Sequence, residues 1–123
     1  MKILVADDDV HISHAIQFLF RKRGHEVYVA EDGERALQLA RDEQPELIFL
    51  DINMPKKSGL EVCEAIRAEA SAQELPIYIL TGQDRSLDLD ENDFTAGATA
   101  YLIKPIAPRE LLAILASHQP CES

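Results

Sequence analysis

The chain has 123 residues, enough for one domain with a single hydrophobic core and too few for two ordinary domains. Its 46% hydrophobic content argues against disorder, and no apolar run is long enough for a membrane span or a signal peptide. The formal net charge of −10 repels phosphate backbones and anionic membranes, which argues against nucleic acid or membrane binding. Cys63 lies on an apolar helical position and Cys121 in a polar tail, so we expect no disulfide and a reducing, cytoplasmic location.

The first third of the chain alternates strand and helix patterns. Residues 2–6 are apolar enough to predict a central strand, which runs into Asp7, Asp8 and Asp9. Asp9 is a natural N-cap for an amphipathic helix that follows. A second strand is predicted over 26–30, and Asp32-Gly33 then forms a turn or a helix cap.

The pattern continues with a buried strand over 47–51 that ends in Asp51 and is followed by a turn around Pro55 and Gly59. Ser58 and Glu61 match a capping box ahead of a third helix.

Two further strands are predicted over 76–81, ending in Thr81, and over 100–104, ending in Lys104. Pro108 suits the first position of the last helix. The acidic stretch 82–96 has a weak helical pattern, from which we expect a short helix over 90–96. Residues 1–118 are therefore expected to form one domain, and 119–123 a C-terminal tail.

Strands that alternate with helices predict an α/β fold with a parallel sheet covered on both faces. We expect a doubly wound, five-stranded sheet with the strand order 2-1-3-4-5. The first and third strands are then neighbours at the switch point, where ligands bind beyond the carboxyl ends of the strands.

The predicted strand ends carry a set of functional groups, namely Asp7, Asp8, Asp51, Thr81 and Lys104. Two carboxylates about 5 Å apart repel by roughly 3 kcal/mol at an effective dielectric near 20, so three together require a cation, a bound proton or Lys104. Oxygen ligands without Cys or His favour Mg²⁺ or Mn²⁺. The matching substrate is a phosphoryl group, with Asp51 as the nucleophile and with Thr81 and Lys104 binding its oxygens.

Each of these residues also has a simpler interpretation when it is taken singly. Asp7 and Asp8 could cap the first helix, and Asp51 could be a turn former. Thr81 is common in strands, and Lys104 could be a solvated strand end. The hypothesis therefore depends on the joint pattern.

Four motifs together resemble the receiver domains of two-component response regulators, the CheY-like family, from Lys2 to about Ser117. The motifs are Val5-Ala6-Asp7-Asp8-Asp9, Leu50-Asp51-Ile52-Asn53-Met54-Pro55 with Ser58-Gly59-Leu60, Ile79-Leu80-Thr81-Gly82, and the segment from Gly97 to Pro105.

The resemblance implies a role for each matching residue around the metal. Asp51 matches the aspartate that accepts phosphate. Asp7 and Asp8 match the acidic pair that holds Mg²⁺, with Asp8 the more direct ligand, and Asn53 matches the residue whose backbone carbonyl binds the metal.

The resemblance also implies the parts of a switch. Thr81 and Lys104 match the residues that bind phosphoryl oxygens, and Tyr101 matches the aromatic residue that responds to movement of Thr81. The Lys104–Pro105 bond matches one that is cis in the family. Gln83, like Asn53, matches a position that tunes hydrolysis of the phosphate.

The function implied is phosphoryl transfer from a phosphohistidine of a sensor histidine kinase or phosphotransfer protein to Asp51. The chain would then act as a switch for an unknown downstream protein, as a monomer or weak dimer, and not as a turnover enzyme. Two alternatives stay open: a phosphatase like the haloacid dehalogenase superfamily, and a degenerate receiver that serves only as a docking module. The sequence leaves the kinase and the output undetermined.

Overall fold

The computed structural model describes residues 1–52, 54, 56–69, 75–81, 99–104 and 106–118. Within these residues, five strands and four helices follow one another along the chain. They are β1 (Lys2–Ala6), α1 (Val10–Arg21), β2 (Glu26–Ala30), α2 (Gly33–Glu43), β3 (Leu47–Asp51), α3 (Gly59–Arg67), β4 (Ile77–Thr81), β5 (Ala100–Ile103) and α4 (Pro108–His118).

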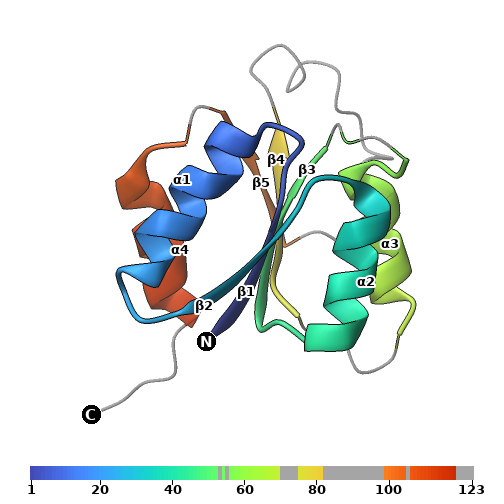
Figure 1. Ribbon diagram of the computed structural model, residues 1–123, viewed down its shortest axis with the longest axis horizontal. Helices are drawn as coiled ribbons and strands as arrows, with labels where there is room; N and C mark the ends of the chain where they lie inside the picture. Colours follow the sequence, from blue (N-terminus) through green and yellow to red (C-terminus); the bar gives the residue numbers. More distant parts are fainter. Residues whose placement is uncertain (53, 55, 70–74, 82–98, 105, 119–123) are drawn as a thin grey trace.

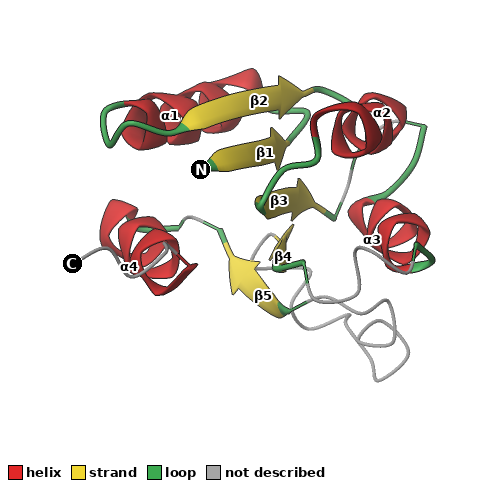
Figure 2. Cartoon of the chain, turned by 90° about the horizontal axis from the view of Figure 1, so that it is seen from below, coloured by secondary structure: helices red, strands yellow, loops and turns green. Residues whose placement is uncertain are grey.

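The strands form one parallel sheet in the order β2-β1-β3-β4-β5, as the sequence predicted. Helices α1 and α4 cover one face of the sheet, and α2 and α3 cover the other (Figures 1 and 2). The fold is therefore the doubly wound α/β arrangement, with β1 and β3 adjacent at its centre.

Polar side chains begin the first three helices, as their sequences indicated. Asp9, Asp32 and Ser58 are the N-caps of α1, α2 and α3, and each accepts a hydrogen bond from a backbone N–H of the first turn at 2.8–3.2 Å. Pro108 is the first residue of α4. A backbone N–H at this position would have no partner within the helix, so proline costs no hydrogen bond there. These caps fix where each helix starts relative to the strand before it.

The apolar residues divide into two clusters, one on each face of the sheet. All five residues of β3 are buried, which explains why its sequence is a continuous apolar run and not an alternating one. The rings of Phe20, Phe49, Tyr78 and His118 lie in a row, with successive centroids 5.5–5.7 Å apart. The Tyr78 hydroxyl and His118 Nε2 are 2.6 Å apart, so this row ties the end of α4 to β4.

Two predicted segments fall outside the part of the chain that the structure describes: the short helix over 90–96 and the tail over 119–123. In the described part, no helix combines the length and the apolar character that crossing a bilayer would require.

Burial makes Cys63 a probe of the fold. It is fully buried in α3 and is not in a disulfide, and burial raises the pKa of its thiol to about 11. In a Cys121→Ser variant, Cys63 is the one remaining cysteine. We expect it to resist alkylation in the folded protein, because its thiol stays protonated at neutral pH and the reagent cannot reach it. Mass spectrometry after iodoacetamide treatment, with and without denaturant, measures this. Equal labelling rates in both conditions would contradict the packing of α3.

Candidate functional site

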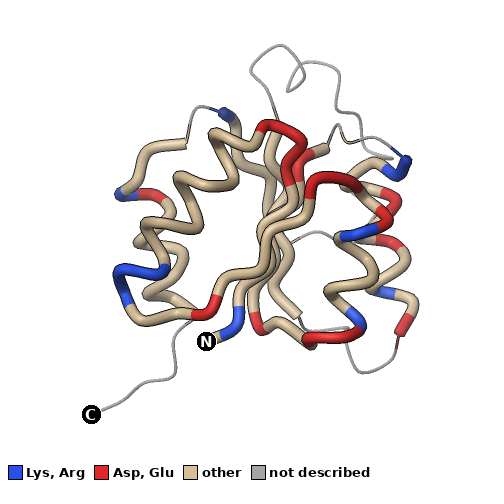
Figure 3. The backbone as a smooth tube through the Cα atoms, viewed as in Figure 1, with Lys and Arg blue, Asp and Glu red and all other residues tan. Residues whose placement is uncertain are grey.

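The carboxyl ends of the strands meet at one edge of the sheet and bring the expected residues together. Asp7 and Asp8 directly follow β1, Asp51 ends β3, Thr81 ends β4 and Lys104 follows β5. In Figure 3 the acidic segments after β1 and at the end of β3 lie close together at this edge. All five residues predicted at the strand ends therefore lie at the same edge of the sheet.

Three carboxylates form the centre of this site. One oxygen each from Asp7, Asp8 and Asp51 lies within 4.8 Å of the others. Asp7 is fully buried and Asp51 nearly so, whereas Asp8 is exposed. Among the residues that the structure describes, this acidic trio is the one group of three or more acidic, His or Cys side chains that could hold a metal ion.

Lys104 faces the trio with its ammonium group. Its Nζ lies 2.7 Å from Asp7 Oδ2 and 3.4 Å from Asp51 Oδ2. Burial lowers the pKa of Lys104, but the contact with Asp7 and the charges of Asp51 and Asp7 outweigh burial and raise the pKa above its ordinary value. Lys104 is therefore held in its charged form beside the carboxylates.

The Asp7 carboxylate fits a cation better than a lysine alone. Its Oδ1 accepts a hydrogen bond from the backbone N–H of Asp9 at 2.9 Å. Its Oδ2 is buried and faces Lys104 Nζ at 2.7 Å. One lysine cannot neutralise three neighbouring carboxylates, and three carboxylates without His or Cys are the donor set that Mg²⁺ or Mn²⁺ prefers.

Thr81 and Tyr101 lie on neighbouring strands. Thr81 is fully buried, and its backbone carbonyl accepts a hydrogen bond from Lys104 N at 2.7 Å. The register pairs Thr81 with Ile103 and Ile79 with Tyr101, so the side chains of Thr81 and Tyr101 project from the same face of the sheet. Tyr101 is half-buried and packs against the cluster under α2 and α3.

Glycine at the start of α3 allows that helix to approach the site. A Cβ on Gly59 would lie 2.3 Å from the backbone oxygen of Asp51, so a side chain there would force the helix away. Sequence reasoning used Gly59 only as a turn former and missed this contact. It also missed Lys56, which has a left-handed backbone with φ of 70°.

Three expected features cannot be placed. Asn53, Gln83 and Pro105 lie outside the described residues, so the metal-facing carbonyl, the hydrolysis-tuning position and the cis peptide bond stay predictions.

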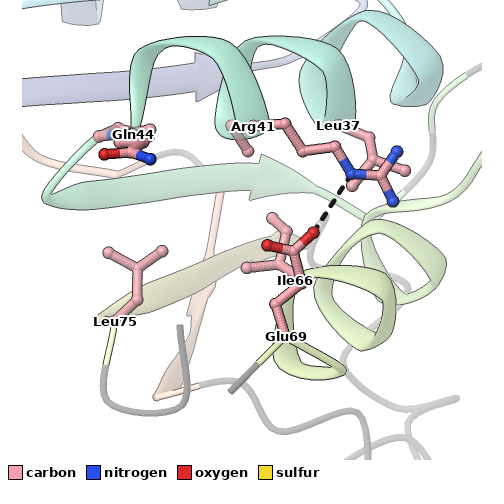
Figure 4. Close-up of a pocket in the computed structure, with 8 residues that line it drawn as sticks. Leu37, Arg41, Gln44, Ile66, Glu69 and Leu75 are labelled. Carbon is pink, nitrogen blue, oxygen red and sulfur yellow. Dashed lines mark ion pairs between the residues drawn. The ribbon is translucent and has the colours of Figure 1, made fainter. Parts of the chain in front are cut away.

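Two hollows have linings that do not include the acidic trio. One, of about 270 Å³, lies between α2 and α3, where Arg41 and Glu69 form an ion pair of 3.4 Å (Figure 4). The other, of about 380 Å³, lies between α1 and α4 and includes Lys104 in its lining. Neither contains a group of acidic side chains like the trio, so the chemistry points to the strand ends.

The comparisons with known proteins agree with this geometry. Residues 3–116 match the model of the response regulator receiver domain family. The chain is 31% identical to the chemotaxis response regulator CheY4 of Vibrio cholerae, with a TM-score of 0.85 over 96% of this chain and 98% of that one. It is 30% identical to the receiver domain of the Francisella response regulator 1452, with a TM-score of 0.81 over 94% and 93%. A CheY-like receiver domain protein from Methanospirillum hungatei is 27% identical, with a TM-score of 0.82 over 94% and 90%.

The chain belongs to the response regulator receiver domain family of two-component signalling systems. The resemblance inferred from its four motifs is confirmed.

Replacing Lys104 by methionine tests the electrostatics of the site. Without Lys104, the buried Asp7 carboxylate loses its cation, and we expect Lys104→Met to lower the free energy of unfolding by about 3 kcal/mol in the absence of divalent ions. Urea denaturation in EDTA measures this, and added Mg²⁺ should restore part of the loss. Lys22→Met removes an exposed lysine and should change stability by less than about 1 kcal/mol. A Lys104→Met variant as stable as the wild type would contradict the ion pair.

Proposed function

We propose that this chain is a phosphorylation switch in which Asp51 accepts a phosphoryl group from a phosphohistidine. One observation carries the proposal: Lys104 and two further carboxylates converge on the Asp51 carboxylate, with Nζ 3.4 Å from Asp51 Oδ2. The donor is a sensor histidine kinase or a phosphotransfer protein, the partners with which receiver domains interact.

The metal in this proposal is Mg²⁺ or Mn²⁺, which Asp7, Asp8 and Asp51 would hold, together with the backbone carbonyl that the family resemblance assigns to Asn53. When bound, it would neutralise charge on the phosphoryl oxygens. The donor set described above supports this assignment, because all three side chains offer carboxylate oxygens.

The protein's own groups divide the remaining work. An Asp51 oxygen forms the new O–P bond as the P–N bond to the histidine breaks, and the electron pair of that bond stays on the imidazole. Lys104 supplies a positive charge to the phosphoryl oxygens, and Thr81 donates a hydrogen bond to them. Positioning and charge account for most of the catalysis in such transfers, since the phosphoryl group itself carries the reactivity.

The switch that follows is a shift between two populated states. Thr81 moves toward the phosphoryl group, and Tyr101, on the adjoining strand and the same face of the sheet, follows it. The surface around β5 changes in consequence and alters binding of a downstream protein. In this role the chain assists only its own phosphorylation and dephosphorylation.

Phosphorylation by a small donor tests the proposal without the unknown kinase. With acetyl phosphate and Mg²⁺, we expect intact-mass spectrometry to show addition of one phosphoryl group to the wild type and none to Asp51→Asn. Omitting Mg²⁺ should abolish the gain, because the carboxylates then repel the anionic donor. Continuous turnover of p-nitrophenyl phosphate would favour the phosphatase alternative. Absence of both phosphorylation and Mg²⁺ binding would favour a docking module.

A further inference from the structure

The loop that follows Asp51 lies against the start of α2. We call residues 52–58, which join β3 to α3, the Asp51 loop. A Cβ placed on Gly33, the first residue of α2, would lie 2.2 Å from the backbone oxygen of Lys57 and 2.5 Å from its Cβ. Backbone cannot yield as a flexible side-chain end can, so this approach is open only to glycine.

Oppositely charged side chains also meet where the Asp51 loop contacts α2. Lys56 Nζ lies 3.8 Å from Asp32 Oδ2 and 3.8 Å from Glu34 Oε2. The other oxygen of Asp32 accepts the N-capping hydrogen bond from Arg35 N at 2.8 Å. The Asp32 carboxylate therefore caps α2 with one oxygen and faces the Asp51 loop with the other.

The ends of the Asp51 loop are also fixed. Gly59 packs against the backbone oxygen of Asp51, and its N–H donates a hydrogen bond to Ile52 O at 3.2 Å. The contact with α2 therefore fixes Lys56 and Lys57, which lie between Asp51 and the start of α3.

Capping alone does not explain Gly33. The Asp32 cap accepts its hydrogen bond from the backbone N–H of Arg35, which does not require glycine at position 33. The close approach of Lys57 does explain it.

We propose that Asp32 and Gly33 are positioning residues for the Asp51 loop, and that their contact with it maintains the affinity of the acidic trio for a divalent cation. The inference rests on the proposed function, because it concerns the same site. It assigns to the start of α2 a role that capping does not include.

The test uses the two methionines as reporters. Met54 lies in the Asp51 loop, whereas Met1 precedes β1 and so lies at the opposite end of the strands from the site. Labelling the methionine methyl groups with ¹³C therefore gives one NMR signal that reports on the loop and one that serves as an internal reference. In Gly33→Ala we expect the Met54 signal to move and the Met1 signal to stay. Calorimetry should show Mg²⁺ binding weakened about tenfold, as for other changes in residues that orient metal ligands.

A control variant separates positioning from stability. Leu39→Ala removes a buried side chain from the middle of α2, distant from the contact with Lys57. It should destabilise the fold and leave both the Met54 signal and the Mg²⁺ affinity of the folded protein unchanged. If Leu39→Ala weakens Mg²⁺ binding as much as Gly33→Ala does, the effect is one of general stability and the proposal is wrong.

A second variant decides the matter if Gly33→Ala does not fold. Asp32→Asn with Glu34→Gln keeps the capping oxygen and removes both charges that face Lys56, and we expect a shifted Met54 signal and about twofold weaker Mg²⁺ binding. The matched control is Asp42→Asn with Glu43→Gln, which makes the same charge change at the other end of α2. It should leave the NMR signal of Met54 unchanged.

The outcomes separate the two proposals. An unchanged Met54 signal and Mg²⁺ affinity in a folded Gly33→Ala, or in the double variant, would overturn the positioning role. A wild type that binds no Mg²⁺ would refute the proposed function, and the Met54 signal would then still test the loop contact.

Discussion

A carboxylate without solvent exposure requires a cation, and the ion pair between Asp7 and Lys104 meets that requirement in this molecule. The pair joins residues that are far apart in the sequence, one after β1 and one after β5. It forms because parallel strands place their carboxyl ends at one edge of the sheet. The same arrangement adds Asp8 and Asp51, which leaves three negative charges facing one lysine. In the proposed function, this excess of negative charge attracts a divalent ion, which in turn allows an anionic phosphoryl donor to approach.

Most of the fold was predictable because local patterns and topology agree. The run Leu47–Asp51 is apolar throughout because β3 is buried on both faces, and the capping residues mark where the helices begin. Given five strands in a doubly wound order, the positions of Asp7, Asp51 and Lys104 follow from the handedness of the connections. The site was therefore predictable as a set of neighbours, although no single residue would have identified it.

The remaining features depend on contacts between distant backbone segments, which leave little trace in the sequence. Gly33 follows a helix cap and Gly59 follows another, so each has a sufficient local explanation that hides its close approach to the Asp51 region. Lys56 adopts a left-handed conformation without the glycine or asparagine that would have signalled it. The preference of Lys104 for Asp7 over Asp51, 2.7 Å against 3.4 Å, also depends on side-chain geometry that spacing cannot supply.

The central claim is that three carboxylates at the carboxyl ends of β1 and β3 gather around one divalent ion opposite Lys104. Anomalous diffraction from crystals grown with Mn²⁺ measures this directly, since the scattering of manganese locates the ion independently of the protein. The account predicts one strong peak at coordinating distance from carboxylate oxygens of the trio, and loss of that peak in crystals of Asp8→Asn with Asp51→Asn. A protein saturated with Mn²⁺ whose peaks all lie elsewhere would contradict the account.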